Sequence, residues 1–126
     1  VILARDRKNI PRAICLAADQ SPSKPESAYW TNFLNQPTGF FTGMERFARE
    51  YEYPVIFVEL IRIKRGYYTM SFEELIKPSY DNVEKGDIIE LFARRLEKSV
   101  LKYPDQYLWS HKRWKHEKPE NATMKW

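Results

Sequence analysis

Cysteine and histidine are scarce in this chain, and their scarcity excludes several kinds of site. The 126 residues include one cysteine and two histidines, so no disulfide framework exists and a reducing compartment is the default. His111 and His116 are five positions apart, a spacing that does not place two metal ligands on one helix face. Cys15 lies within the apolar run AICLAA, not beside a histidine that would activate a nucleophile. We therefore expect no metal and no cofactor.

Long hydrophobic runs and glycine-rich loops are also missing. The longest apolar run, PVIFVELI at 54–61, is interrupted by Glu59 and falls short of the ~18 residues that a membrane-spanning helix needs. No signal peptide is visible. The four glycines form neither a Walker loop nor a GxGxxG motif, and no GxSxG occurs. Any membrane contact within this chain is therefore expected to be peripheral.

Positive charge is concentrated in two segments. The formal net charge is only +4, and the hydrophobic content of 43% is enough for the core of one domain. Lysine and arginine gather in RIKR at 62–65 and in residues 111–126, where five of them face only Glu117 and Glu120. Both segments favour anionic partners.

The first residues indicate that the chain is part of a larger domain. VILARDRKN opens without an initiator Met, and residues 2–9 fit the last turns of a surface helix that Pro11 ends. We therefore interpret the chain as a fragment of something longer.

An apolar segment after this helix predicts a buried strand. RAICLAADQ at 12–20 is a short run without alternation, which is typical of a strand covered on both faces. It ends in Asp19 and Gln20, and polar residues at the carboxyl end of such a strand commonly contact ligands in open α/β sheets. The alternative is that these two residues merely begin the polar loop at 21–27.

Residues 28–51 predict an aromatic core segment followed by a helix. Five aromatic rings lie at 28–41; such rings usually fill a core, and an apolar cleft wall is the alternative. Thr42 and Glu45 have the T-x-x-E spacing of a capping box. The apolar residues that follow at helical spacing are Met44, Phe47, Ala48 and Tyr51.

A hairpin is predicted next. PVIFVELIRIKRGYYTMSF at 54–72 has the composition of two strands around a turn, where Gly66 supplies the permissive backbone of a tight connection. Residues 55–58 are expected to be fully buried, and residues 67–72 to be half exposed, as at a sheet edge. Residues 73–86 are expected to be irregular.

A long helix completes the set of elements. Asp87 is expected to cap it, with Glu90 three residues later, and Glu90 with Arg94 has the favourable i, i+4 spacing. Pro104 ends it. One side is lined by Ile88, Ile89, Phe92, Ala93, Leu96 and Val100. We expect an α/β or α+β fold with a mixed sheet flanked by helices.

The segment YPDQYLWSHKRWK at 103–115 combines four aromatic rings with three fixed cations and His111. It fits a solvated, partly frayed terminus. It also fits stacking on nucleic-acid bases, or phosphate binding beside an aromatic belt at a membrane surface. Composition alone does not choose among these three interpretations.

Several stretches together resemble a known family. AADQS, FTGMERFAREYEYPVIFVELIRIKRGYY and RRLEKSVLKYPDQYLWSHKRWK are similar to the C-terminal half of the lipid A biosynthesis acyltransferases, the late lauroyl and myristoyl transferases of Gram-negative bacteria. The resemblance covers roughly residues 2–118, and HKRWKH is most similar to the Bacteroidetes versions. It implies part of a lysophospholipid-acyltransferase-like fold. Residues 1–126 would then be the C-terminal portion of a single acyltransferase domain, without the N-terminal half that carries the catalytic motif. The most specific block matches the family's P-E-Q-Y-L-W-x-H-R-R-F-K, with Asp105, Lys112 and Trp114 as departures.

The resemblance implies transfer of a fatty acyl chain from acyl carrier protein or acyl-CoA to a phosphorylated glucosamine lipid at the cytoplasmic face of the inner membrane. The family's catalytic motif is HxxxxD or HxxxxE, in which the histidine acts as general base. This sequence lacks it, because His116 follows His111 by five positions and Asn121 follows His116 by five. We therefore expect no catalytic residue here and a fragment that is inactive alone.

The resemblance also implies substrate contacts for the matched positions. Contacts with the acceptor head group or a catalytic neighbour are implied for Asp19 and Gln20. Contacts with phosphate or acidic carrier protein are implied for Arg62, Lys64 and Arg65. Contacts with lipid phosphate or the bilayer surface are implied for His111, Lys112, Arg113 and Lys115. Membrane-interface positions are implied for Trp109 and Trp114.

Three other interpretations are also consistent with the sequence, one of which is a folding fragment without measurable binding. In the second, the block at 103–115 is structural: Tyr107, Leu108 and Trp109 pack on the last helix, while His111 and Arg113 tie the sheet edge by hydrogen bonds. In the third, the chain is a small basic module that binds nucleic acid or an anionic membrane surface, and steep salt dependence would identify nucleic-acid binding. The family resemblance predicts no nucleic-acid partner.

Overall fold

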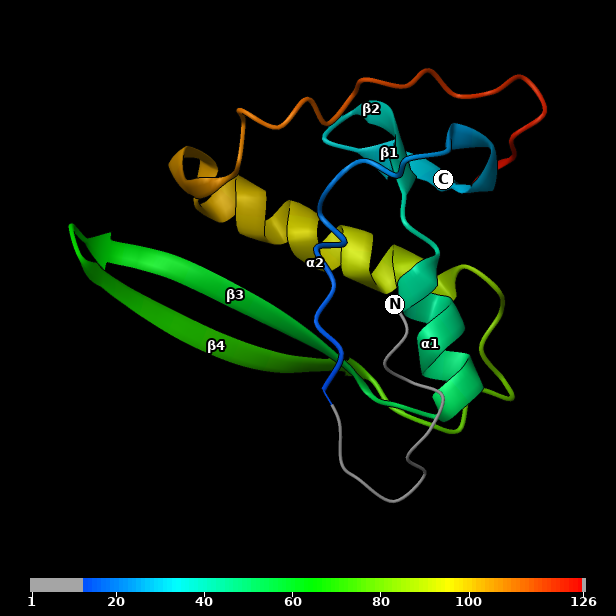
Figure 1. Ribbon diagram of the computed structural model, residues 1–126, viewed down its shortest axis with the longest axis horizontal. Coiled ribbons are helices and arrows are strands. Elements are labelled where there is room, and N and C mark those ends of the chain that lie inside the picture. The colour runs from blue at the N-terminus through cyan, green and yellow to red at the C-terminus, as the bar shows by residue number, and fades with distance from the viewer. Residues whose placement is uncertain (1–12, 126) are drawn as a thin grey trace.

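The computed structural model describes residues 13–125 (Figure 1). The helix predicted before Pro11 lies outside the described residues. The elements, in chain order, are the 3-10 turn η1 (Pro25–Ser27), β1 (Tyr29–Phe33), β2 (Gln36–Phe40), α1 (Gly43–Tyr51), β3 (Val55–Lys64), β4 (Tyr67–Ile76), α2 (Asp87–Lys102), the 3-10 turn η2 (Pro104–Gln106) and β5 (Met124–Lys125). Within residues 13–125, no helix has the length and apolar character needed to cross a membrane.

The strands form two separate sheets. One has the order β2-β1-β5, in which β1 pairs antiparallel with β2 and parallel with β5. The other is the antiparallel β3–β4 hairpin. With two helices beside them, the sheets form an α+β arrangement with one mixed sheet, which confirms the predicted fold class.

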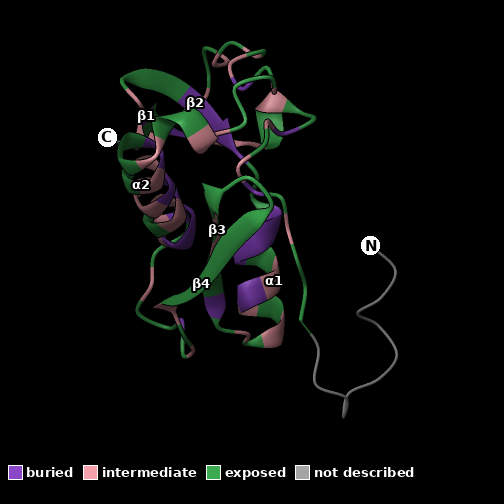
Figure 2. Cartoon of the chain, turned by 90° about the vertical axis from the view of Figure 1, so that its left-hand side faces the viewer, coloured by how far each residue is buried: buried purple, intermediate pink, exposed green. Residues whose placement is uncertain are grey.

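Helix α2 contacts both sheets and α1 and runs between them in Figure 1. The apolar side predicted for this helix is buried, with Phe92 partly exposed at its margin. Arg94 Nε and Glu90 Oε1 are 2.9 Å apart, as the spacing predicts. Figure 2 shows the buried stripe of α2 facing the rest of the molecule.

The aromatic segment at 28–41 forms the β1–β2 hairpin. Leu34 and Asn35 occupy its two-residue loop with φ of 51° and 62°, as a primed turn requires. Phe33 and Phe40 are fully buried and meet edge to face, with ring centroids 5.5 Å apart. Trp30 is also buried. These three rings are core residues, as the simpler interpretation predicts.

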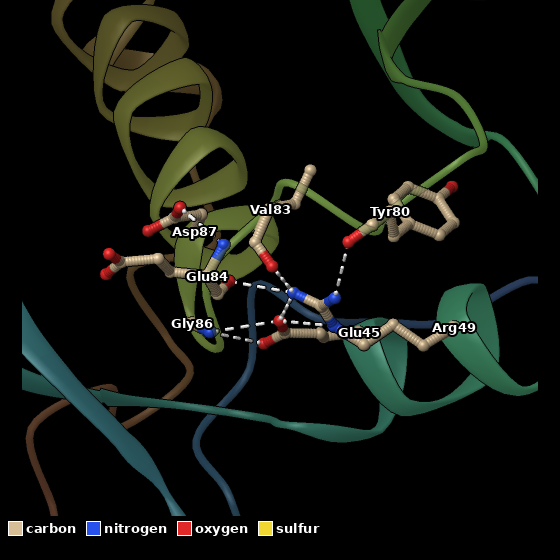
Figure 3. A network of polar contacts seen from close by, with 7 residues as sticks. All are labelled: Glu45, Arg49, Tyr80, Val83, Glu84, Gly86 and Asp87. Carbon is tan, nitrogen blue, oxygen red and sulfur yellow. Dashed lines mark hydrogen bonds and ion pairs between the residues drawn. The ribbon is translucent and has the colours of Figure 1, made fainter.

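The prediction of helix α1 is confirmed, but the prediction of a capping box at its start is wrong. The Thr42 hydroxyl makes no cap hydrogen bond and donates instead to Ser27 O at 3.4 Å. Glu45 is 5% exposed, and its carboxylate accepts hydrogen bonds from the backbone N–H of Gly86 at 2.9 Å and from Arg49 Nη2 at 2.7 Å (Figure 3). The Glu45 carboxylate therefore binds the backbone of Gly86, which is distant in sequence, and not the backbone at the start of its own helix.

The same connection explains a second wrong prediction, at the start of α2. Gly86, not Asp87, is the N-cap, with φ of 100°. A Cβ at this position would lie 2.4 Å from Tyr29 Cε2, so both the backbone conformation and the close packing require glycine. The Asp87 carboxylate accepts from the backbone N–H of Glu84 at 3.1 Å instead.

The β3–β4 hairpin is confirmed, with two corrections. Burial alternates where full burial was predicted: Val55 and Phe57 are buried, whereas Ile56 and Val58 are exposed. The reason is that only one face of this hairpin packs against the core. Strand β4 also continues to Ile76 through part of the segment predicted to be irregular, because β3 supplies a partner along its whole length.

The buried strand predicted at residues 12–20 is wrong for its described part. Residues 13–17 have no regular structure and are mostly exposed, and a turn follows at Ala18 and Asp19. A strand needs a neighbour that satisfies its backbone groups. None of the strand pairs among residues 13–125 includes this segment.

We predict that Glu45→Ala destabilises the fold by about 2–4 kcal/mol, because it leaves the Gly86 N–H and the Arg49 guanidinium without their buried acceptor. Chemical unfolding of purified protein measures this. Glu50→Ala on the exposed side of α1 is the matched control and should change the free energy of unfolding by less than about 0.5 kcal/mol. Equal effects of the two substitutions would contradict the role of Glu45.

We predict that Glu59 makes stability depend on acid pH. Hydrogen bonds from Arg95 and then Ser99 lower the pKa of the Glu59 carboxyl below its ordinary value of 4.5. Because the folded pKa is the lower one, the stabilisation is complete above the ordinary value and is lost as the pH falls through the folded pKa. Glu59→Gln should therefore cost about 1–2 kcal/mol at neutral pH, and this cost should shrink by about pH 3.

Urea unfolding at both pH values tests the Glu59 prediction. Glu26→Gln, at an exposed carboxylate in η1, is the control and should show no such change. A cost for Glu59→Gln that is the same at both pH values would contradict the prediction.

Candidate functional site

A large apolar groove lies beside the free edge of β3. It has a volume of about 830 Å³, within the ~300–1,000 Å³ typical of small-molecule sites. Residues 13–19, α1, β3, α2 and residues 103–108 each contribute to its lining. The lining is mainly apolar, with Leu16, Met44, Val58 and Leu96 among its residues. Such a groove can bury a flexible hydrocarbon chain.

Asp19, Tyr107 and Arg113 form a polar cluster beside this groove. Asp19 and Tyr107 both line the groove. Burial raises the pKa of the Tyr107 hydroxyl; the Asp19 carboxylate raises it further, and the Arg113 cation opposes this. Burial lowers the pKa of the Arg113 guanidinium, whereas charge interactions with Tyr107 and then Asp19 raise it. The three groups are therefore electrostatically coupled although they come from two distant parts of the chain.

Arg113 is a buried cation. It is 4% exposed, its Nη2 donates to Gly39 O at 2.8 Å, and its guanidinium lies 4.6 Å from the centroid of the Phe40 ring. Its Nε and Nη1 have no hydrogen-bond partner among the described residues. Arg113 thus anchors the chain to β2 and places a positive charge next to Asp19 and Tyr107.

His111 and Trp114 also make long-range hydrogen bonds. His111 Nε2 accepts from the backbone N–H of Ser21 at 2.9 Å, which assigns the ring proton of the neutral imidazole to Nδ1. The Ser21 hydroxyl donates to Arg113 O at 2.6 Å. Trp114 Nε1 donates to Thr38 Oγ1 at 2.8 Å. We call residues 103–116 the C-terminal strap, because its side chains hold the loop at Ser21 and strand β2.

Other predicted residues of the C-terminal strap lie at the surface. Trp109 is 53% exposed; its Nε1 donates to Pro104 O at 2.6 Å, and its ring meets Tyr107 edge to face. Lys112 and Lys115 are exposed. These two lysines, unlike Arg113, are free to meet an anionic partner.

The predicted cations of the hairpin lie around its tip. Arg62, Lys64 and Arg65 are exposed, and Lys64 Nζ lies 4.3 Å from the centroid of the Tyr67 ring. Gln20 is exposed too, and it is absent from the groove lining. The structure therefore brings Asp19 and Arg113 together at the groove and leaves the hairpin cations and Gln20 outside the polar cluster.

Sequence reasoning missed the positions of two residues at the site. Tyr107 lies in the polar cluster, and Gln106 lies in the groove wall. The Gln106 side chain accepts from the backbone N–H of Arg62 at 2.7 Å and donates to Arg62 O at 3.3 Å. It thus occupies the place of a further strand beside β3. The sequence signal that could have identified Gln106 and Tyr107 is their position in QYLW, a part of the block that resembles the family.

We predict that Gln106→Ala exposes the free edge of β3. Hydrogen exchange of the Arg62 amide should become about tenfold faster, because its acceptor is removed and local opening becomes easier. The free energy of unfolding should fall by less than about 1 kcal/mol, since the bond is solvent-exposed. Gln36→Ala, at an exposed position of β2, is the control and should leave this amide unchanged. Unaltered exchange at Arg62 in Gln106→Ala would contradict the assignment.

Comparison with known proteins gives a family. The model of the bacterial lipid A biosynthesis acyltransferase family matches residues 3–116. Searches of curated proteins and of solved structures returned no match. The matched range includes all the predicted site residues, the groove and the polar cluster. This chain therefore belongs to the bacterial lipid A biosynthesis acyltransferase family.

Proposed function

We propose that this chain supplies the acyl-chain groove and part of the head-group site of an acyltransferase of lipopolysaccharide biosynthesis. The donor is acyl carrier protein or acyl-CoA, and the acceptor is a phosphorylated glucosamine lipid at the cytoplasmic face of the bacterial inner membrane. The observation that carries the proposal is an apolar groove of about 830 Å³ with Asp19 and Tyr107 in its lining. A fatty acyl group needs such a groove, and its polar head needs the charged neighbours.

The chemistry divides between the groove and the polar cluster. The Asp19 carboxylate accepts a hydrogen bond from an acceptor hydroxyl or amide, and the Arg113 cation lies close enough to interact with it electrostatically. Arg113 is buried, so it acts on the substrate through Asp19 and Tyr107. Phosphate contacts fall to the exposed Lys112 and Lys115, whose ammonium groups keep most of their freedom in water.

We assign no proton transfer to this chain. The sequence has no HxxxxD or HxxxxE motif, and His111 Nε2 already accepts a hydrogen bond from the backbone of Ser21. A general base needs a free lone pair directed at the attacking hydroxyl. We therefore propose that the chain binds an acyl group but does not transfer it by itself.

The geometry disfavours nucleic-acid binding as the main function. Base stacking requires exposed rings, and phosphate neutralisation requires exposed cations. Arg113 is buried beneath β2, and the indole N–H of Trp114 is bonded to Thr38. Two of the groups that composition offered for stacking and neutralisation are therefore engaged within the fold.

We predict that the chain binds myristoyl-CoA and does not measurably bind CoA that lacks an acyl chain. Isothermal titration calorimetry below the concentration at which myristoyl-CoA forms micelles measures both. Ile14→Asp combined with Leu108→Asp should weaken myristoyl-CoA binding at least tenfold, or about 1.4 kcal/mol, because both side chains line the groove and a carboxylate disfavours the hydrocarbon chain.

Leu101→Asp is the matched control for this experiment. Leu101 is an exposed leucine of α2, and it does not line the groove. The Leu101→Asp substitution should leave the affinity for myristoyl-CoA unchanged. Equal binding of CoA and myristoyl-CoA, or equal losses in the control and in the groove variant, would refute the proposed function.

A further inference from the structure

The β3–β4 hairpin has an uncovered apolar face. The register pairs Val58 with Phe72 and Leu60 with Met70, and residues directly opposite each other in an antiparallel pair share one face. All four are at least half exposed, from 50% for Val58 to 68% for Phe72. Figure 1 shows the hairpin projecting from the helices, and Figure 2 shows its exposed surface. Contiguous apolar surface of this kind marks an interaction site.

The opposite face of the hairpin is already occupied. Phe57 is buried, and the Arg95 guanidinium of α2 lies 4.5 Å from its ring centroid. Arg95 also contacts Glu59 at 3.1 Å and Glu73 at 2.6 Å. The hairpin is thus fixed to α2 by one face. On the other face Val58, Leu60 and Phe72 also line the groove. The exposed apolar surface outside the groove is that of Met70 and of Ile63, Tyr67 and Tyr68 around the tip.

The tip of the hairpin is cationic. Residues 60–72 include Arg62, Lys64 and Arg65 and no aspartate or glutamate. The flanking Glu59 and Glu73 are both paired with Arg95. Asp105 lies 4.0 Å from the Arg62 guanidinium in an exposed pair, whereas no ion pair is found for Lys64 or Arg65 among the described residues. Near an anionic membrane, each such cation contributes about 1 kcal/mol. The charge of this region therefore complements a negatively charged surface.

We propose that the tip of the hairpin, residues 62–70, docks onto an anionic lipid bilayer. The cations of the tip lie among the head groups, Tyr67 and Tyr68 lie at the level that suits an apolar ring with a hydroxyl, and Ile63 and Met70 contact the acyl boundary. The proposal rests on the proposed function for its biological setting, and it assigns the membrane contact to the hairpin in addition to Trp109.

Two alternative occupants fit the hairpin less well. A nucleic acid would use the rings and cations, but it would leave the aliphatic side chains Ile63 and Met70 without apolar partners. A second copy of this chain would present the same apolar and cationic hairpin tip, which offers no negative charge to Lys64 and Arg65. A bilayer satisfies both the charge and the aliphatic surface.

The backbone limits how deep the hairpin can lie. The N–H and C=O of Arg62 point away from β4, because both bond to Gln106. By the two-residue alternation of a strand, the corresponding groups of Leu60 and Val58 point the same way. Unpaired backbone groups are not tolerated in hydrocarbon. The hairpin therefore lies in the hydrated interface and does not insert.

Vesicle co-sedimentation tests the docking. The chain should bind vesicles of phosphatidylglycerol and phosphatidylcholine far better than vesicles of phosphatidylcholine alone, and added salt should weaken the binding. Ile63→Ser with Met70→Ser, and separately Lys64→Gln with Arg65→Gln, should each weaken it at least tenfold. The controls are Leu91→Ser and Lys98→Gln, both at exposed positions of α2, and they should bind as the unaltered chain does.

Hydrogen exchange on the unaltered chain supplies a measurement that needs no variant. Amides of residues 60–70 should gain protection when anionic vesicles are added, and those of α2 should not. The proposal is overturned if the chain does not bind anionic vesicles, or if the hairpin variants bind like the controls. It is also overturned if protection of residues 60–70 rises with protein concentration alone, which would identify a second copy as the occupant.

The two proposals can fail separately. Neither Ile63 nor Met70 lines the groove, so the hairpin variants should still bind myristoyl-CoA. Loss of vesicle binding in the unaltered chain with normal myristoyl-CoA binding would overturn the docking alone. Vesicle binding without myristoyl-CoA binding would count against the proposed function alone.

Discussion

Burial of the apolar face of α2 is the constraint on which the rest of the structure depends. The two sheets share no strand, and both contact this helix. Polar side chains of α2 beside the buried face form hydrogen bonds and ion pairs with each sheet separately. Glu97 accepts from the backbone N–H of Leu34 at 2.6 Å in the β1–β2 hairpin, while Arg95 reaches β3 and β4. One helix thus sets the relative position of both groove walls and the hairpin.

The C-terminal strap completes what α2 begins. Gln106 bonds to β3, His111 bonds to the loop at Ser21, and Arg113 and Trp114 bond to β2. Because these bonds join segments distant in sequence, the strap determines where Asp19 and the groove wall lie. A segment whose basic and aromatic composition resembles a ligand-binding tail therefore makes mainly structural contacts, and Lys112 and Lys115 stay exposed.

Under the proposed function, the buried and the exposed groups have different roles. The groove takes apolar surface from α1, α2 and β3, where removal of hydrocarbon from water supplies the driving force. The polar cluster holds its charges beside the groove, where burial strengthens their mutual interaction. The cations of the hairpin tip stay in solvent, where they act at longer range and are screened by salt.

Local periodicity in the sequence was sufficient to predict the buried side of α2, the extent of α1 and the turn at Gly66, because each depends on near neighbours in the chain. The mixed α+β class and the family followed from the order of elements and from the block at 103–115. Only the tertiary structure decided that Glu45 binds Gly86 instead of capping its own helix, that Arg113 is buried against Gly39, and that residues 13–17 form no strand. Those outcomes depend on partners far away in sequence, since a buried polar group takes whichever partner the packed fold brings within hydrogen-bonding distance.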